Sequence, residues 1–163
     1  MPIVIERKHR LARESYKGPI SVAFTLCLHG AGELPEFFPP ETADRFIDFL
    51  TSVSSETHCF VPVYCFMPDH HHLIAAGKGS GSDLWKMMVK YKQKTGFWLS
   101  RNSSLRWQKD FYDHILGPGE DLVAQVKYIL DNPVRKGLAK SWEEYPFKGS
   151  VGCKLEDVLR GIM

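Results

Sequence analysis

Three consecutive histidines at positions 70 to 72, set between two apolar segments, constrain the fold of this chain more than any other feature. The segment from His58 to Phe66 is apolar and rich in β-forming residues, and a second apolar run continues from the histidines to about Ala76. Pro68-Asp69 between them is typical of a turn, so two strands joined by a turn are expected. Pro62 lacks a backbone N–H and predicts an edge or a bulge in the first strand.

Strand geometry divides the three histidines between two faces. Successive side chains of a strand point in opposite directions, so His70 and His72 share one face and His71 lies on the other. The shared face makes His70 and His72 a candidate two-imidazole metal clamp. For a single histidine, a solvated surface position or a hydrogen-bonded core position is the more common alternative, but three in succession after Pro-Asp favour a ligand site.

The remaining hydrophobic pattern predicts an α+β fold. The order of elements is strand, helix, strand, strand, helix, strand and helix, which fits a ferredoxin-like antiparallel sheet with helices on one or both faces and one further helix towards the C-terminus. Outside the histidine hairpin, alternation or helical spacing of the apolar residues predicts elements over 20–28, 41–54, 83–99, 105–116 and 120–131.

Local signals refine the boundaries of these elements. Ser82 is the expected N-cap of the second helix, and a turn near Lys109-Asp110 is expected to interrupt the fourth strand. Pro133 is expected to end the last helix, because the residue before a proline resists the helical conformation. We expect residues 1–163 to form a single domain with a basic arm over 1–18, a core over 19–148 and a C-terminal tail over 149–163.

Composition limits the class of function. The net charge is only +2, so no overall basic field indicates nucleic acid, and a basic surface must come from local clusters. The four cysteines form no CxxC pair, which predicts reduced thiols rather than a disulfide framework or a zinc knuckle. No apolar run approaches about 18 residues and the N-terminus lacks a signal-type core, so we expect a soluble cytoplasmic protein that does not span a membrane.

The basic residues gather in two places. The first is the arm over 1–18, for which a solvated tail is an equally good interpretation. The second is a stripe that recurs every four residues on the helix predicted over 83–99; such stripes are usually solvated, but this one follows the histidine strand, where a phosphate backbone could pass. The residues concerned are Arg7, Lys8 and Arg10 in the arm, and Lys86, Lys90 and Lys94 in the stripe.

Three sequence blocks, over 67–73, 107–114 and 128–138, resemble the HUH single-tyrosine transposases. Within that family the chain is most similar to the REP-associated tyrosine transposases, and the likeness extends from about Val22 to Phe147. His71 departs from the family pattern, which usually has a bulky apolar residue between the two ligating histidines. The blocks read Met-Pro-Asp-His-His-His-Leu, Trp-Gln-Lys-Asp-Phe-Tyr-Asp-His and Tyr-Ile-Leu-Asp-Asn-Pro-Val-Arg-Lys-Gly-Leu.

The resemblance implies cleavage of single-stranded DNA beside a hairpin, by a tyrosine and with a divalent metal. A neutral phenol, with a pKa of about 10, is a poor nucleophile at neutral pH. A cation bound by His70 and His72 would polarise the scissile phosphate, so that the oxygen of Tyr128 can attack phosphorus, displace the 3′ oxygen and form a 5′-phosphotyrosine. The phosphodiester is exchanged rather than hydrolysed, so no nucleotide cofactor is expected.

Asn132 lies one helical turn after Tyr128 and is the expected third ligand, through its amide oxygen. The alternative is a helix C-cap, a common role for asparagine before proline. Imidazole, amide oxygen and water suit Mg²⁺ or Mn²⁺ best, with zinc the alternative by ligand chemistry alone. Tyr128 falls outside the apolar stripe of its helix, whereas Tyr112, the other candidate nucleophile, is interpreted as a core or DNA-facing aromatic residue.

Two function classes therefore compete: a metal-dependent single-strand endonuclease and strand transferase, and a domesticated protein that binds the hairpin without cutting it. Within the enzymes, a replication-initiator or relaxase nuclease is a nearer rival, but its histidine motif usually stands in a different order relative to the tyrosine. A monomer is expected, with a homodimer as the alternative, because related insertion-sequence transposases dimerise. The candidate DNA contacts are Arg7, Lys8, Arg10, Lys86, Lys90, Lys94, Arg106 and Lys109.

Overall fold

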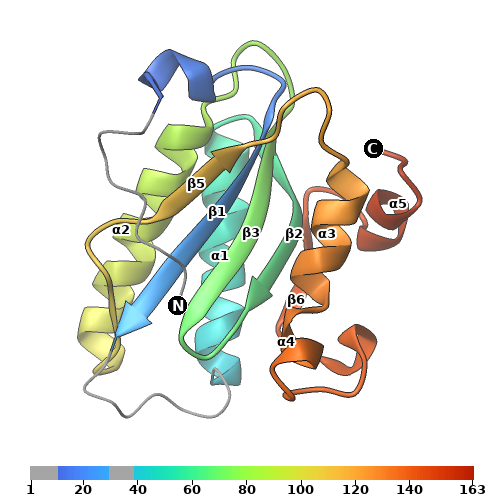
Figure 1. Ribbon diagram of the computed structural model, residues 1–163. Coiled ribbons are helices and arrows are strands. Elements are labelled where there is room, and N and C mark those ends of the chain that lie inside the picture. Colours follow the sequence, from blue (N-terminus) through green and yellow to red (C-terminus); the bar gives the residue numbers. More distant parts are fainter. Residues whose placement is uncertain (1–10, 30–38) are drawn as a thin grey trace.

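The computed structural model describes residues 11–29 and 39–163. A β-α-β-β-α-β path leads from β1 to strands β4 and β5, which both pair with β1, and three helices and one further strand follow it (Figure 1). The elements are β1 (Ser21–His29), α1 (Pro40–Glu56), β2 (Cys59–Phe66), β3 (His70–Gly77), α2 (Leu84–Asn102), β4 (Arg106–Trp107), β5 (Tyr112–Ile115), α3 (Leu122–Leu130), α4 (Asn132–Arg135), β6 (Lys148–Val151) and α5 (Leu155–Leu159), with 3-10 turns at Arg13–Tyr16 and Trp142–Glu144.

The strands form one antiparallel sheet in the order β4-β1-β3-β2-β6, and β5 also pairs with β1. This topology confirms the expected ferredoxin-like α+β class. The strand predicted over 105–116 is divided into β4, which pairs with the end of β1, and β5, which pairs with its beginning. Pro62 lies at a register shift between β2 and β3, so the predicted bulge is present, but β2 is an interior strand flanked by β3 and β6.

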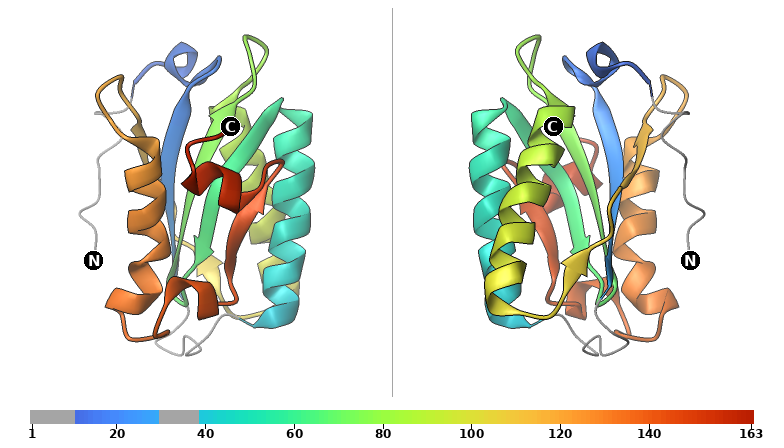
Figure 2. Two further views of the ribbon diagram at one scale, coloured as in Figure 1. Left: turned by 90° about the vertical axis from the view of Figure 1, so that its right-hand side faces the viewer. Right: turned by 90° about the vertical axis from the view of Figure 1, so that its left-hand side faces the viewer.

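Helices cover the two faces of the sheet unequally. Helices α1 and α2 pack side by side on one face, and α3 lies on the opposite face (Figure 2). Phe46 of α1 is the centre of the first interface, because its ring contacts aromatic rings from β2, β3 and α2. On the face that carries α3, alternate residues of β1 remain only half-buried. That face therefore keeps room for polar side chains.

Two residues that were expected to mark helix boundaries, Ser82 and Pro133, have other roles in the structure. Asp83, not Ser82, caps α2, because its carboxylate accepts the backbone N–H of Lys86. The hydroxyl of Ser82 instead accepts the N–H groups of Lys78 and Gly79 and donates to the carbonyl of His58. Ser82 thus closes the connection between β3 and α2.

Pro133 does not end the helical path. Helix α3 stops at Leu130, but Asp131 keeps a right-handed helical conformation, and Pro133 lies in the first turn of α4. A proline is tolerated there because the first N–H groups of a helix have no intrahelical acceptor. Asn132 is therefore the first residue of a new helical turn rather than a C-cap, and the cap of α3 is Asp131.

The predicted boundary between core and tail falls inside the sheet. Strand β6 pairs with β2, and Val158 of α5 is buried in the core. Residues 149–163 are therefore part of the folded unit. Strand β6, with the sequence Lys-Gly-Ser-Val, carries too few apolar residues to show the alternation that reveals a strand.

The cysteines and the helices can be compared with what the composition predicts. All four cysteines are free, and burial raises the pKa of each thiol, in the case of Cys65 to about 12. A high pKa keeps these side chains as unreactive thiols at neutral pH. Within the residues that the structure describes, no helix is both long and apolar enough to cross a bilayer.

Candidate active site

Strand β3 separates the histidines as the alternation predicts. His71 faces α1 and α2 and is fully buried, with its ring centroid 4.4 Å from that of Phe66 and 5.1 Å from that of Trp107. Burial holds the pKa of His71 well below its usual value, and the neighbouring histidines act in the same direction. His71 therefore serves as a neutral aromatic core residue, in the place where an apolar side chain would pack.

His70 and His72 lie together on the opposite face, with ring centroids 4.6 Å apart. Nδ1 of His70 is 2.6 Å from a carboxylate oxygen of Asp69. A carboxylate only accepts, so this nitrogen carries the hydrogen and Nε2 keeps its lone pair. Nδ1 of His72 is 3.0 Å from the hydroxyl of Thr25, which lies directly across from it on β1. Outer-shell partners on Nδ1 orient metal-binding histidines in this way.

The charge state of His72 also suits a ligand. Its pKa is lowered to about 3, first by burial and then by the electrostatic effects of His70 and Arg135. The imidazole is therefore neutral at physiological pH, and a neutral imidazole is the form that binds a metal. The orienting roles of Thr25 and Asp69 were missed in the sequence; Asp69 was visible within the motif, but Thr25 depends on the register between β1 and β3.

Asn132 joins the histidines from α4, and its side chain is almost fully buried. Its amide nitrogen is 3.2 Å from Nε2 of His70, so the lone pair of that imidazole accepts a hydrogen from the amide. This contact connects two motifs that are 62 residues apart in the chain. The structure thus brings together the three predicted metal ligands His70, His72 and Asn132.

Tyr128 lies on the outer side of α3, and 64% of its surface is exposed. The buried residues of α3 are Val126, Ile129 and Leu130, so the predicted separation of Tyr128 from the apolar stripe is present. Asp121 fixes the start of this helix by accepting the N–H groups of Val123 and Ala124. The phenol is therefore open to a large substrate.

Arg135 connects Tyr128 with the ligand cluster and was missed as a functional residue. Its guanidinium carbon lies 4.1 Å from the centroid of the Tyr128 ring, and Nη2 donates to Oδ1 of Asn132 at 3.3 Å. Nη1 donates to a carboxylate oxygen of Asp131 at 3.1 Å and to the carbonyl of Tyr128 at 3.2 Å. The detectable signal was its spacing, because residues four and seven positions after Tyr128 share its helical face.

The donor atoms fit a divalent cation that keeps part of its water shell. Two imidazole nitrogens and one amide oxygen leave coordination positions for water and a phosphate oxygen, which is the arrangement that Mg²⁺ and Mn²⁺ tolerate. Among the described residues, no group of three or more His, Cys, Asp or Glu side chains could hold a metal by itself. A site at this place therefore depends on Asn132.

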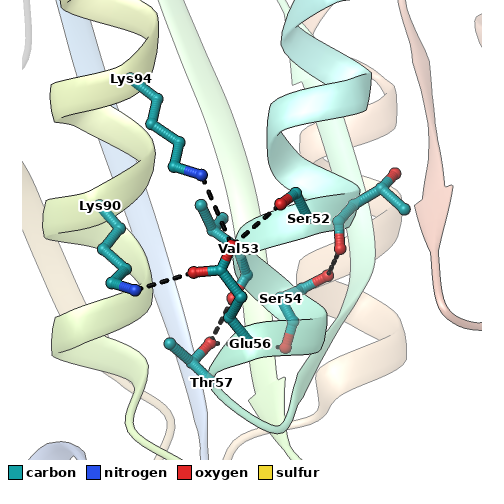
Figure 3. Close-up of polar contacts among 8 residues, drawn as sticks. Ser52, Val53, Ser54, Glu56, Thr57, Lys90 and Lys94 are labelled. Atoms are coloured by element: carbon teal, nitrogen blue, oxygen red, sulfur yellow. Dashed lines mark hydrogen bonds and ion pairs between the residues drawn. The ribbon is translucent and has the colours of Figure 1, made fainter.

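The lysine stripe is remote from the histidine pair. Nζ of Lys90 lies 2.8 Å and Nζ of Lys94 3.5 Å from the carboxylate of Glu56 on α1 (Figure 3). Hydrogen bonds from Lys90 and Ser52, and the charges of both lysines, lower the pKa of Glu56 to about 2. The stripe lies on the layer formed by α1 and α2, and the sheet separates it from His70 and His72. Lys86 lies exposed in the first turn of the same helix.

Arg106 and Lys109 lie elsewhere, beside a surface groove of about 310 Å³ that Phe97 and Trp107 also line. Arg106 has a structural role as well, because Nη1 donates to carbonyl groups at the end of α2, including those of Leu99 and Ser103. The groove combines cationic and aromatic side chains. Arg7, Lys8 and Arg10 lie outside the described residues.

Tyr112, the second candidate nucleophile, lies on β5 opposite Thr25 of β1. Thr25 in turn pairs with His72, so the three residues form a row across the sheet and share the face that carries the site. Tyr112 is therefore two strands away from the nearer histidine. Its position makes it a suitable control for Tyr128.

Comparison with known proteins agrees with the motifs. No protein-family model matches the chain. A Haemophilus influenzae protein described as a REP-associated tyrosine transposase is 26% identical over 97 residues, which cover 51% of this chain and 54% of that protein. The match thus spans about half the length of this curated relative.

A solved structure shares the fold along almost the whole chain. It is a REP-associated tyrosine transposase bound to a REP hairpin, and it superposes with a TM-score of 0.72 at 20% sequence identity. The match covers 98% of this chain and 88% of the other. In sequence and in fold, the chain is similar to REP-associated tyrosine transposases.

Proposed function

We propose that this chain is a metal-dependent single-stranded DNA endonuclease and strand transferase that cuts beside a hairpin and forms a 5′-phosphotyrosine through Tyr128. The observation that carries the proposal is the 3.2 Å contact between Asn132 and His70. It ties the helical segment that bears the nucleophile to the strand that bears the imidazoles. The similarity to REP-associated tyrosine transposases supports the same activity and the same kind of hairpin substrate.

In this proposal His70, His72 and Asn132 hold Mg²⁺ or Mn²⁺, while Asp69 and Thr25 orient the two imidazoles. When bound, the cation supplies positive charge that polarises the scissile phosphate. Helix α3 presents the phenol oxygen of Tyr128 to phosphorus, and proximity of this kind accounts for much of the rate of such reactions.

The exchange of bonds is balanced without a further reactant. A bond forms between the phenol oxygen and phosphorus, and the bond between phosphorus and the 3′ oxygen breaks. The phenol proton passes to water, which reaches the exposed Tyr128, and the departing 3′ oxygen takes up a proton. Attack of a 3′ hydroxyl on the phosphotyrosine reverses these changes and rejoins the DNA.

The test is incubation of the protein with a labelled hairpin that has single-stranded flanks, in Mn²⁺, followed by denaturing electrophoresis. We expect a covalent protein-DNA band with the wild type and with Tyr112→Phe, and none with Tyr128→Phe. The Tyr128→Phe change removes one oxygen and keeps the ring, so hairpin binding should persist. A band that persists in Tyr128→Phe and disappears in Tyr112→Phe would assign the nucleophile to Tyr112.

The same assay tests the non-cleaving alternative. If the wild type binds hairpins but forms no covalent band with any of them, hairpin binding without cleavage becomes the better description. We also propose that the groove beside Arg106 and Lys109 contacts DNA, because aromatic rings and cations together suit unpaired nucleotides. Lys109→Gln should then make the negative slope of log affinity against log salt shallower by about one unit.

A further inference from the structure

The side-chain amide of Asn132 is held in one orientation from both ends. Its nitrogen faces Nε2 of His70, which is an acceptor because Asp69 takes the hydrogen of Nδ1. Its oxygen faces Nη2 of Arg135, which can only donate. Each end of the amide therefore meets the partner that it requires. The oxygen needed for metal binding points away from the imidazole and towards the guanidinium.

Metal binding requires the opposite orientation. If the amide turned by half a rotation, its oxygen would face the imidazoles, but its NH₂ group would meet the guanidinium of Arg135, and two donors would oppose each other. The amide of Asn132 can therefore serve as a ligand only when Arg135 has left its present position. The positive charge of Arg135, which is close enough to lower the pKa of His72, also opposes a divalent cation at the same place.

Arg135 has a natural second partner in the proposed reaction. Its side chain is 36% exposed and covers the ring of the proposed nucleophile, so it stands where the phosphate must approach. A guanidinium matches the geometry of a phosphate with two parallel hydrogen bonds. A phosphate in front of Tyr128 would therefore draw Arg135 away from Asn132.

We infer that Arg135 is a positioning residue that couples metal binding to DNA binding: without DNA it holds the amide oxygen of Asn132, and with DNA it binds the scissile phosphate and releases that oxygen to the metal. The inference rests on the proposed function. Coupling between two ligands is reciprocal, so DNA strengthens metal binding by the same factor by which metal strengthens DNA binding. The site then assembles fully only on its substrate.

The test measures metal binding rather than cleavage. Mn²⁺ is titrated by calorimetry into protein carrying Tyr128→Phe, which keeps the ring beneath Arg135 and prevents reaction, with and without the hairpin oligonucleotide. We expect the hairpin to tighten Mn²⁺ binding by about tenfold, within the range usual for coupled sites. Adding Arg135→Gln should tighten Mn²⁺ binding in the absence of DNA and reduce the effect of the hairpin to less than about twofold.

Arg135→Gln is thus expected to strengthen Mn²⁺ binding without DNA and to weaken the effect of the hairpin on it. A purely structural role of Arg135 would not produce this combination. If Arg135 merely held the end of the helical segment, Arg135→Gln would weaken Mn²⁺ binding both with and without DNA, and the inference would fail. It would also fail if the hairpin tightened Mn²⁺ binding equally in both proteins. Arg135→Lys keeps the charge but not the fork, and should retain only part of the coupling.

Arg45→Gln is the matched control. Arg45 also stacks on an aromatic ring, that of Phe49 at 4.8 Å, but it lies on α1, across the sheet from the site. Its removal also deletes one positive charge and should leave the coupling unchanged. If protein with Tyr128 forms the covalent band but the hairpin does not tighten Mn²⁺ binding in the titration, this inference alone is overturned. Coupling without any covalent band would overturn the proposed cleavage and leave Arg135 its role.

Discussion

The two faces of β3 give identical side chains opposite roles. On the face towards α1 and α2, His71 is enclosed by aromatic rings and completes a packed layer. On the face towards α3, His70 and His72 each have a polar partner on Nδ1, and Nε2 of His70 faces the amide of Asn132. Burial alone does not distinguish the two faces, since His72 is also largely buried. On the face towards α3, both imidazoles have a hydrogen-bonding partner on Nδ1, which is the arrangement that a metal-binding histidine needs.

The largest expected effect concerns the packed face. His71→Ala should lower the free energy of unfolding by about 3 kcal/mol, because it removes an aromatic ring from a filled core. His71→Phe keeps the volume and should cost less than about 1.5 kcal/mol. Urea unfolding measures both. A His71→Ala variant as stable as the wild type would show that the ring does not contribute to packing.

The next effect concerns the polar face. His70→Ala and His72→Ala should each weaken Mn²⁺ binding by about 100-fold, at the upper end of what even outer-shell changes produce. His71→Phe should bind Mn²⁺ like the wild type, because its ring lies on the other face. Calorimetric titration without DNA measures all three. Equal losses in the three variants would contradict the separation of the faces.

A smaller effect is expected in the pH dependence of the free energy of unfolding, to which the buried His71 contributes. The pKa of His71 is lowered by burial, so below the unfolded-state pKa of about 6.5 the unfolded chain binds a proton that the folded protein excludes. Stability is therefore full above this pH and falls as the pH decreases. His72 adds a similar loss, which continues towards its folded pKa of about 3.

We therefore expect metal-free wild type to lose stability between pH 6.5 and 5, and His71→Phe to lose less, by up to about 1.4 kcal/mol per pH unit. Urea unfolding in a chelating buffer at several pH values measures the difference. The carboxylates titrate similarly in both proteins, so they cancel. Parallel profiles for the two proteins would mean that His71 is protonated as easily when folded as when unfolded.

The smallest effect should come from the lysines on the outer surface of the packed face. Removing Lys90 and Lys94 is expected to leave the salt dependence of hairpin binding unchanged, because both lysines pair with Glu56 and the sheet separates them from the site. Hairpin affinity at several salt concentrations, with Lys109→Gln as the comparison, measures this. A slope shallower by about one unit for each lost lysine would support their predicted role as phosphate contacts.

Local periodicity explains what could be predicted from the sequence. The alternation along β3 and the helical spacing around Tyr128 are properties of consecutive residues, so the division of the histidines and the exposure of Tyr128 were both accessible. The contact of Thr25 with His72 was not, because it depends on the register between β1 and β3. The partner of the lysine stripe was hidden for the same reason, since Glu56 belongs to another helix. The contacts of Arg135 are all within its own helical segment, so its spacing from Tyr128 and Asn132 was an available signal that was missed.

Strand β6 illustrates a second limit. Gly149 lies so close to Tyr64 that a Cβ atom there would be 2.7 Å from the phenol oxygen. The residue is suited to this strand by what lies opposite it rather than by its own preference for extended structure, which is low. Tertiary contact determines such a segment, and a search for periodic apolar residues passes over it.

The proline-started turn after α3 also limits how the chain can change in length. Tyr128 is four residues before Asn132, and one inserted residue between them would rotate the phenol by about 100° around the helix axis. That rotation would carry the phenol to the position that Lys127 now occupies, away from the helical face that it shares with Asn132 and Arg135. Substitutions on the exposed side of α3 leave this angle intact. Descendants of this chain are therefore free to alter the composition of the segment, but its residue count is fixed.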